Sequence, residues 1–387
     1  MSINLDVAAE AFAASRDGTV GLEEEFAVLD AQTLDMVPRF EELRDAAADD
    51  AVLGTSISGE LISSEIEIRS GRGEDLADAF ARQREARRRL FALAAGHGVA
   101  LGSTGTHPWA DFREQRFIDT EHYRRVADEL RYVARRNSTF SLHVHVGVHD
   151  LDRAVRVSDR LRDVLPLLLA VSASSPYLDG LDAGLHSART QAFTKNFPRC
   201  GIPDAYGGWA AFRDYLDLLI RTGSIIEYTQ VWWSVRPHLS FGTVEVRICD
   251  AQMTAGESEG LAAMIVACVL QAARDDDEGV PAADRPRRLL EENVWRAIRY
   301  GMDGALIDLD RGEEEPARAA LERVLRWTAP ARDEHGIDVA LPALNGAQRQ
   351  RRALDAGASL REVYADAVRE TRETYAASDE RAGAPTH

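Results

Sequence analysis

The hydrophobic residues of the chain recur with two different periods. Four segments in the first half place apolar or β-branched side chains at every second position, which predicts β-strands. These strands are predicted at residues 19–30, 61–70, 99–104 and 139–148. The segments between and after them have helical spacing, which predicts helices. These helices are predicted at 39–48, 74–96, 120–135 and 150–175, the last with a kink at Pro166.

The second half begins with a long segment, 175–208, that is rich in Gly, Pro and aromatic residues and lacks a clear period. A connection of this length predicts a binding loop or lid. A helix at 209–221 follows, and then an antiparallel strand pair, 231–236 and 241–250, with its turn at 237–240. The remaining pattern is mostly helical, with a surface linker at 275–281. These helices are predicted at 256–273, 285–300, 313–327 and 359–375.

This order of elements predicts the fold class. Turns suited to antiparallel strands, with helices grouped on one side, favour an α+β fold with a mainly antiparallel sheet over a doubly wound parallel sheet. We expect an N-terminal segment at 1–18, a single domain at 19–375 and a disordered tail at 376–387.

Four predicted strands carry two polar residues at i and i+2 spacing, so that both side chains point to the same face. The pairs are Glu23 and Glu25, Glu65 and Glu67, His143 and His145, and Glu245 and Arg247. Alternation of this kind is also typical of any half-exposed antiparallel sheet, and one pair alone would indicate a solvated face. Because all four pairs consist of groups suited to metals or anions, together they favour a site.

Carboxylates with one or two imidazoles suit Mg²⁺ or Mn²⁺ better than structural zinc. Glu60 is a further candidate, but it precedes Glu67 by seven residues and would face the opposite way in one unbroken strand. It reaches the same site only from the turn at Ser58 and Gly59 or across a bulge. From the residues alone its role stays open. Glu24, between Glu23 and Glu25, faces the other side of the strand.

Charge and composition exclude several classes. The 387-residue chain has a net charge of −18, which argues against a nucleic-acid-binding surface. We find no apolar stretch of about 20 residues and no signal peptide, so neither a membrane partner nor export is expected. The best apolar segments, 165–171 and 261–270, are interpreted as buried helix faces. A cytoplasmic protein is the expectation, and its oligomeric state stays open.

Other motifs give weaker signals. Cys200, Cys249 and Cys268 lack disulfide or zinc spacing, although Cys200 lies in a loop where it could react. The chain has no phosphate-binding or dinucleotide glycine motif, so phosphate recognition must rely on arginines, on Lys195, the only lysine, on backbone N–H groups or on metals. Several basic residues are candidates for binding carboxylate or phosphate, or are simply solvated. They are Arg189, Lys195, Arg199, Arg296, Arg299 and Arg349, the last after a turn or helix start at Asn345.

The ordered motifs of this chain resemble those of the YbdK-type carboxylate–amine ligases, also called type 2 glutamate–cysteine ligases. They are G-L-E-E-E-F, S-S-E-I-E-I-R-S-G, G-T-H-P, L-H-V-H-V-G-V, N-F-P-R-C-G-I-P, G-T-V-E-V-R-I-C-D and W-R-A-I-R-Y-G-M-D, spread over residues 19–352. The resemblance implies a glutamine-synthetase-like fold and a site for ATP, Mg²⁺ or Mn²⁺ and an acidic amino acid. One departure is Cys200, where many members have serine or threonine.

Carried over residue by residue, the resemblance implies a set of roles. The implied metal ligands are Glu23, Glu25, Glu60, Glu67, His143 and Glu245. Arg247 is implied to contact phosphate, which makes Arg247 and Glu245 the expected catalytic residues. We also expect Lys195 and Arg299 to help bind ATP, and Arg199 and His145 to bind substrate.

The resemblance implies a reaction in which ATP activates glutamate as γ-glutamyl phosphate and the amine of cysteine displaces phosphate. The expected partners are therefore small molecules. Two alternatives stay open at this stage: a metal-dependent hydrolase that uses the same Glu and His face to activate water, and a noncatalytic paralogue that binds nucleotide or metal.

Overall fold

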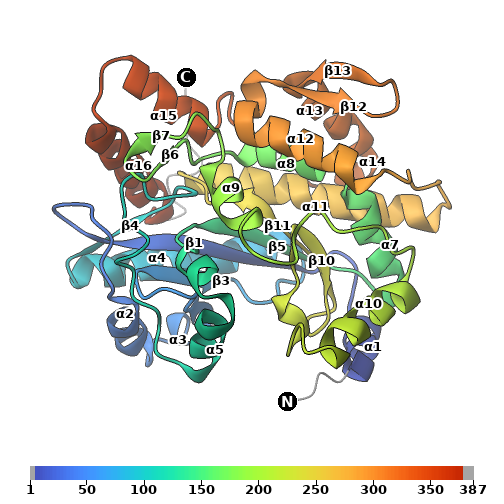
Figure 1. The fold of residues 1–387 in the computed structure, drawn as a ribbon, viewed down its shortest axis with the longest axis horizontal. Coiled ribbons are helices and arrows are strands. Elements are labelled where there is room, and N and C mark those ends of the chain that lie inside the picture. The colour runs from blue at the N-terminus through green and yellow to red at the C-terminus, as the bar shows by residue number, and fades with distance from the viewer. Residues whose placement is uncertain (1–4, 378–387) are drawn as a thin grey trace.

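A computed structural model describes residues 5–377 of the chain. Its centre is a seven-stranded sheet in the order β10-β11-β5-β1-β3-β2, with β4 paired to the far end of β1 (Figure 1). All of these pairings are antiparallel, which confirms the predicted α+β class. The strands are β1 (Val20–Asp30), β2 (Ile57–Ser58), β3 (Glu65–Arg69), β4 (Val99–Gly102), β5 (Ser141–Gly147), β10 (Val235–His238) and β11 (Thr243–Asp250).

One face of the sheet is apolar and covered by helices. Its strands contribute Leu22, Val144 and Val246, which are at most 2% exposed and belong to the largest hydrophobic core cluster. These side chains pack under long helices because alternation places all of them on one side. The helices that contact the strands there are α4 (Leu76–Gly96), α7 (Leu151–Leu161), α8 (Leu165–Ser172) and α11 (Ala255–Asp277).

The two apolar segments interpreted as helix faces are buried as expected. All eight residues of α8 are buried, and so are residues 261–270 of α11. By length and composition α11 could cross a membrane, but 83% of its most apolar window is buried inside the molecule. That environment is typical of a core helix in a large domain.

The remaining helices surround this core. They are α1 (Leu5–Ala13), α2 (Phe40–Ala47), α3 (Leu53–Ser56), α5 (Glu121–Leu130), α6 (Tyr132–Arg135), α9 (Ala188–Thr194), α10 (Trp209–Arg221), α12 (Arg287–Tyr300), α13 (Ala317–Trp327), α14 (Ala329–His335), α15 (Gly346–Asp355) and α16 (Leu360–Tyr375). The N-terminal segment thus contains a helix, α1, which buries Leu5 and Phe12 in the core. The predicted tail at 376–387 lies outside the described residues except for its first two.

Several predicted boundaries were wrong for identifiable reasons. Pro166 does not kink one helix but lies in the first turn of a new one, where its missing N–H is tolerated. The predicted turn at 237–240 begins too early, because Pro237 lies inside β10, an edge strand that needs no donor there. The predicted helix at 120–135 is divided at Arg131, whose φ is +53°.

Several short elements were missed. Residues 313–316, predicted as helix, form strand β13 (Glu313–Pro316), which pairs with β12 (Ala305–Asp308). Asp308 accepts hydrogen bonds from the two backbone amides that turn this hairpin, so its D-L-D-R-G sequence contained a readable turn signal. The predicted loop at 175–208 contains α9, and α11 runs into the predicted linker as far as Asp277. Short pairs inside this loop and beyond it are β6 (Tyr177–Leu178) with β7 (Leu181–Asp182) and β8 (Cys200–Gly201) with β9 (Trp232–Trp233).

Candidate active site

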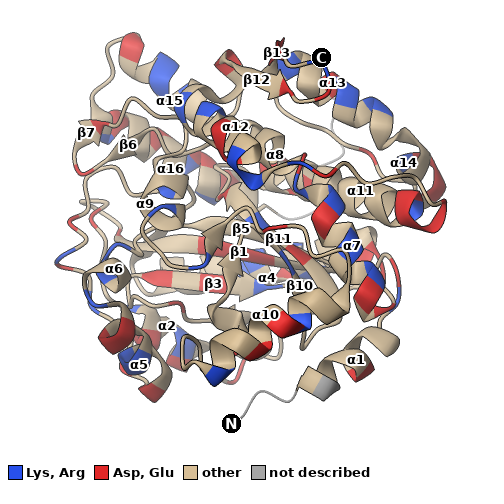
Figure 2. Ribbon diagram, turned by 45° about the vertical axis from the view of Figure 1, so that its right-hand side comes forward, with Lys and Arg blue, Asp and Glu red and all other residues tan. Residues whose placement is uncertain are grey.

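The strand register gathers the predicted polar pairs on the face opposite the buried helices. Glu23 on β1 lies across from His143 on β5, and Glu25 lies across from Glu67 on β3. On the next strand, Glu245 lies across from His145. The acidic segments of β1 and β3 therefore lie side by side near the middle of the sheet (Figure 2).

Two groups of three ligand-type side chains form on this face. Glu23, His143 and Glu245 each offer one donor atom within 4.8 Å of the other two. We call this group the His triad. Within it, His143 Nδ1 lies 3.1 Å from Glu23 Oε2. Because β1, β5 and β11 are neighbouring strands, the sheet itself sets the spacing of this group.

The second group, which we call the Glu triad, consists of Glu25, Glu60 and Glu67, again with donor atoms within 4.8 Å. Glu60 lies in the segment between β2 and β3 and not within a strand, so the alternation of faces does not apply to it. Glu60 therefore reaches this group from outside the strands, while its role as a ligand stays a prediction. The two triads together contain all six of the residues expected to bind metals.

Positive charge surrounds the His triad. The Arg236 Nε lies 2.6 Å from Glu245, and Arg247 forms a second ion pair with the same carboxylate. Burial alone would raise the pKa of Glu245, but Arg236, Arg247 and His145 lower it well below its usual value. His145 likewise offsets the burial of Glu23 and lowers its pKa. Both carboxylates are therefore charged at neutral pH.

The Glu triad lacks such compensation. Burial and the charge of Glu60 raise the pKa of Glu25 to about 7. Burial and the charges of Glu23 and Glu60 raise the pKa of Glu67 well above its usual value. Glu65, the next acid on the same face, has its pKa raised by burial and by Glu25 and Glu60. The close arginine is Arg69, whose Nε lies 3.4 Å from Glu67, and its charge does not outweigh burial and the acidic neighbours. Several buried carboxylates that share so little positive charge are the arrangement that a bound divalent ion relieves.

The donor chemistry of both triads fits hard divalent cations. Three carboxylates suit Mg²⁺ or Mn²⁺, and the His triad adds one imidazole to two carboxylates. Burial and Arg247 lower the pKa of His143 to about 4, so its ring is neutral and able to donate a lone pair. Ser141 holds both groups in place, because its hydroxyl lies 2.7 Å from Glu25 and 2.8 Å from His143.

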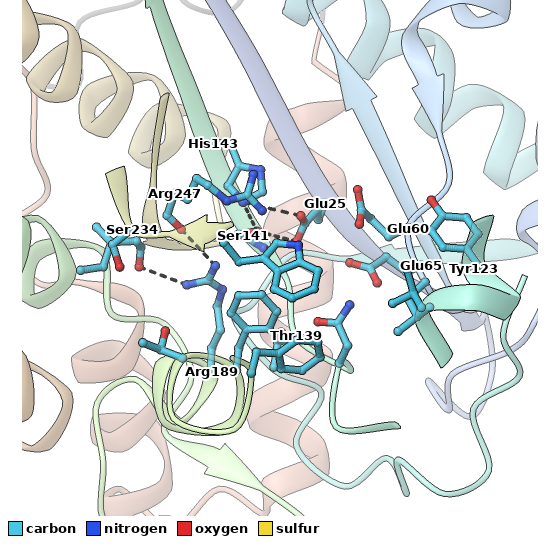
Figure 3. Close-up of a pocket in the computed structure, with 18 of the residues that line it drawn as sticks. Glu25, Glu60, Glu65, Tyr123, Thr139, Ser141, His143, Arg189, Ser234 and Arg247 are labelled. Carbon is cyan, nitrogen blue, oxygen red and sulfur yellow. Dashed lines mark hydrogen bonds and ion pairs between the residues drawn. The ribbon is translucent and has the colours of Figure 1, made fainter. Parts of the chain in front are cut away.

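Two cavities flank this face. The smaller, of about 130 Å³, lies beside the Glu triad and is partly lined by residues of α5 and α9 (Figure 3). Its lining includes Glu25, Glu60, Glu65, His143, Arg189, Trp232 and Arg247. The larger, of about 430 Å³, lies beside Glu23 and His145. Arg69, Arg72 and Phe241 also line this larger cavity.

Some predicted site residues lie elsewhere. Lys195 forms an ion pair with Glu291, and Arg299 donates to the carbonyl of Gly184 at 2.6 Å. Neither residue lines the two cavities, so their expected contact with ATP gains no support from this geometry. Arg199 lies behind the cavity wall, with its guanidinium 5.5 Å from the ring centre of Trp232.

The weaker motifs have structural roles. Asn345 caps α15 in a reciprocal pair with Gln348, so this motif is an ordinary helix start. Arg349 pairs with Glu257 and Glu370, and Arg296 pairs with Glu314. The three cysteines are buried, and burial raises the pKa of each thiol to about 12, which leaves them unreactive.

Four residues of the site were missed or undervalued from the sequence alone. Arg236 was not considered, and the turn predicted at 237–240 would have put it opposite Phe241, whereas the register in the structure puts it opposite Glu245. Ser141 gave no signal, because a serine at a strand start is common. Glu65 was recognised on the polar face but given no role, and Arg189 was considered only as one of several loop cations.

Comparisons with known proteins identify the family. The model of glutamate–cysteine ligase family 2 matches residues 19–374. A Rubrobacter xylanophilus protein, provisionally named glutamate–cysteine ligase 2-1, is 36% identical over 365 residues, which cover 92% of this chain and 96% of the relative. A Halobacterium salinarum glutamate–cysteine ligase is 36% identical over 349 residues, covering 89% and 95%.

Solved structures agree on the fold. A glutamate–cysteine ligase from Francisella tularensis in complex with AMP has a TM-score of 0.63 at 12% identity, with 94% of this chain and 90% of that chain covered. A bifunctional glutathione synthetase from Pasteurella multocida has a TM-score of 0.69 at 15% identity, with 96% of this chain covered but only 54% of that longer chain. The chain belongs to glutamate–cysteine ligase family 2, whose members are ATP-dependent ligases that form carbon–nitrogen bonds.

Proposed function

We propose that this protein joins the γ-carboxylate of glutamate to the amine of cysteine at the expense of ATP. One observation carries the proposal: the His triad and the Glu triad lie side by side on one sheet face, each with donors suited to a divalent cation. The family membership and the names of the relatives agree with it. Two triads of ligand-type side chains, flanked by two cavities, suit a reaction that brings a polyphosphate to a carboxylate.

The larger cavity is the proposed site of the nucleotide. Phe241, 56% exposed, stacks on His238 with ring centres 4.1 Å apart, which offers an aromatic surface to a base. Arg69 and Arg72 line the same cavity and carry charge suited to phosphates. From there the phosphate chain would extend past Glu23 towards the smaller cavity, where the amino acids would bind.

The proposed reaction has two steps, a phosphoryl transfer and the formation of an amide. A glutamate γ-carboxylate oxygen attacks the γ-phosphorus of ATP, so that ADP leaves and γ-glutamyl phosphate forms. The cysteine nitrogen then attacks the acyl carbon, loses its proton and expels inorganic phosphate. Divalent ions held by the two triads would supply charge neutralisation on the phosphate oxygens. The chain itself supplies no nucleophile.

Arg247 is the residue we propose to contact the transferring phosphoryl group. It lines the smaller cavity and is anchored by an ion pair with Glu245, while Glu245 is also held by Arg236. Arg236 in turn donates to the carbonyl of Val231 at 2.6 Å, so this chain of contacts fixes the guanidinium of Arg247 before substrate binds. Such preorganisation aids catalysis, because no reordering is needed when charge develops.

The test is to follow ADP release with Mg²⁺ and ATP while glutamate and cysteine are omitted in turn. ADP release should require both amino acids, and mass spectrometry should detect γ-glutamylcysteine. ADP release that depends on neither amino acid would contradict the proposal and favour a hydrolase. A parallel screen of amino acids and amines by mass spectrometry would identify a different acceptor.

A further inference from the structure

The smaller cavity separates negative from positive groups. Carboxylates on one side come from Glu25 on β1, Glu60 in the segment before β3 and Glu65 on β3. Arg189 from α9 and Arg247 from β11 supply guanidinium groups on the other (Figure 3). A ligand that fills this cavity therefore meets acids at one end and arginines at the other.

Glu65 differs from the other acids of the cavity. It is 1% exposed and belongs to neither triad. Its Oε2 is buried and accepts no hydrogen bond from any residue that the structure describes. Its register position, opposite Ala27, lies one step along the sheet from the Glu triad. Native proteins leave few buried polar atoms unpartnered, because each costs free energy, so this oxygen points to a donor that a ligand brings.

Arg189, at the opposite end of the smaller cavity, has a buried donor atom without a partner among the described residues. It is 5% exposed, and its two terminal nitrogens donate to the carbonyls of Ile248 and Arg247 at 3.0 and 3.2 Å. These bonds fix the guanidinium, but its Nε is buried and has no partner among the described residues. A fixed, buried guanidinium with spare donor capacity suits a carboxylate.

One class of ligand satisfies both groups. A molecule with a protonated amine can donate to Glu65, and a carboxylate on the same molecule can accept from Arg189. Arg189 already lies 3.7 Å from Asp250, but its Nε would stay without a partner if the ligand were a simple amine. A dicarboxylate without an amine would leave the Oε2 of Glu65 without a donor. The pair therefore favours a zwitterion, an amino acid that presents both charges.

We propose that Glu65 binds the ammonium group, and Arg189 the carboxylate, of an amino acid substrate in this cavity. This rests on the proposed function only in taking the cavity as the site of an amino acid. Glu65 would then determine specificity, because it selects substrates with an amine, whereas the two triads serve the phosphate chemistry. A merely structural role for Glu65 would not distinguish ligands that differ only in the amine.

The test measures binding by calorimetry in Mg²⁺, with two pairs of probes that differ only in the amine. The pairs are L-glutamate with glutarate, and L-cysteine with 3-mercaptopropionate. The wild type should bind the amino acid of at least one pair at least about tenfold more tightly. In Glu65→Gln this preference should fall to about twofold or less, with the affinity of the amine-free probe unchanged.

Three variants complete the design. Glu65→Asp should restore part of the preference, and Arg189→Lys should weaken both members of a pair equally. Glu74→Gln removes the same charge at an exposed position and should change nothing. Circular dichroism melts would show whether each variant is folded.

The proposal is overturned if the wild type shows no amine preference in either pair, or if the preference survives in folded Glu65→Gln. Its failure is separable from that of the proposed ligase reaction. An amine preference that depends on Glu65 in a protein that forms no amide would support this inference alone. Amide formation without such a preference would support only the ligase reaction.

Discussion

Two adjacent residues on β1, Glu24 and Glu25, are both buried acids, at 3% and 5% exposure, yet they lie in opposite environments. Glu24 faces the helices and is bound by Arg87 of α4, whose Nε lies 2.8 Å away. Gln83 donates to the same carboxylate at 2.9 Å, and Ser258 of α11 also donates to it. Arg87 is itself only 1% exposed, so this is a buried and fully partnered ion pair.

Glu25 faces the cavity and has no arginine in hydrogen-bonding contact within the described chain. Its hydrogen-bond donors are the amide and hydroxyl of Ser141, and burial and the charge of Glu60 raise its pKa to about 7. The comparison shows that burial alone does not identify a functional acid. A buried carboxylate that has its own cation depends on that cation, because removing it leaves an uncompensated charge in the core. A buried carboxylate without one is a candidate for a cation that a ligand brings.

The sharpest test of this difference is Glu25→Gln. We expect turnover to fall by at least about 100-fold, because the residue would hold a cation that neutralises the transferring phosphate. The melting temperature should not fall, since the change removes an uncompensated buried charge. Steady-state ADP release and a thermal melt measure both. Wild-type turnover in this variant would remove Glu25 from the proposed site, and Arg247→Ala should give a loss of similar size.

Arg87→Met tests the other side of β1. It leaves Glu24 buried without its cation, and we expect a loss of about 3–5 kcal/mol in the free energy of unfolding. Urea denaturation would measure this, and the protein that remains folded should keep its specific activity. The double variant Arg87→Met with Glu24→Leu should recover much of the stability. A stable single variant with low activity would reverse the roles assigned to the two acids.

Divalent ions should stabilise the protein through the cavity face alone. With Mg²⁺ or Mn²⁺ at about 100 times its dissociation constant, binding to the native state adds about 2.7 kcal/mol. Thermal melts with and without the metal should therefore differ by several degrees in the wild type. The shift should shrink in Glu67→Gln. The matched control is Glu257→Gln, a buried acid paired with Arg349 away from the site, which should keep the full shift.

Strand alternation predicted much of this arrangement from the sequence. It put Glu23 and Glu25 on one face and Glu24 on the other, and the register in the structure agrees. It also placed His143 and Glu245 on strands that proved to be neighbours of β1 or β5. Local periodicity sufficed here because the faces of a strand depend only on the parity of residue numbers.

Contacts between distant segments could not be predicted in this way. Arg87 lies 63 residues from Glu24, and nothing in its Arg-rich helix marks it as the one that turns inward. The expected roles of Lys195 and Arg299 rested on charge alone, and both side chains have partners outside the cavities. The position of Glu60 in the Glu triad could not be predicted either, because it depends on how the segment before β3 folds. Pairing of long side chains depends on tertiary packing, which residue type and spacing do not encode locally.

His107 provides the smallest test, because it shows a third outcome for a buried ionisable group: it stays neutral. Its Nε2 lies 2.8 Å from the carbonyl of Leu34, and its Nδ1 accepts from the amide of Ala110 at 3.0 Å. Burial lowers its pKa to about 4, with nearby Asp35 acting to raise it and Arg361 to lower it. The unfolded chain, with an ordinary pKa near 6.5, therefore binds the proton more readily than the folded protein.

The sign of the effect follows from this difference. Stability from neutral His107 is complete above about pH 6.5 and is lost as pH falls towards 4, by at most about 1.4 kcal/mol per pH unit. His107→Asn keeps an acceptor near the Nδ1 position but does not titrate, so its unfolding free energy should fall less steeply between pH 6.5 and 4. Urea denaturation across this range measures both slopes. Equal slopes, or an NMR titration of the His107 ring with a midpoint near 6.5, would show that burial without a charged partner does not keep this group neutral.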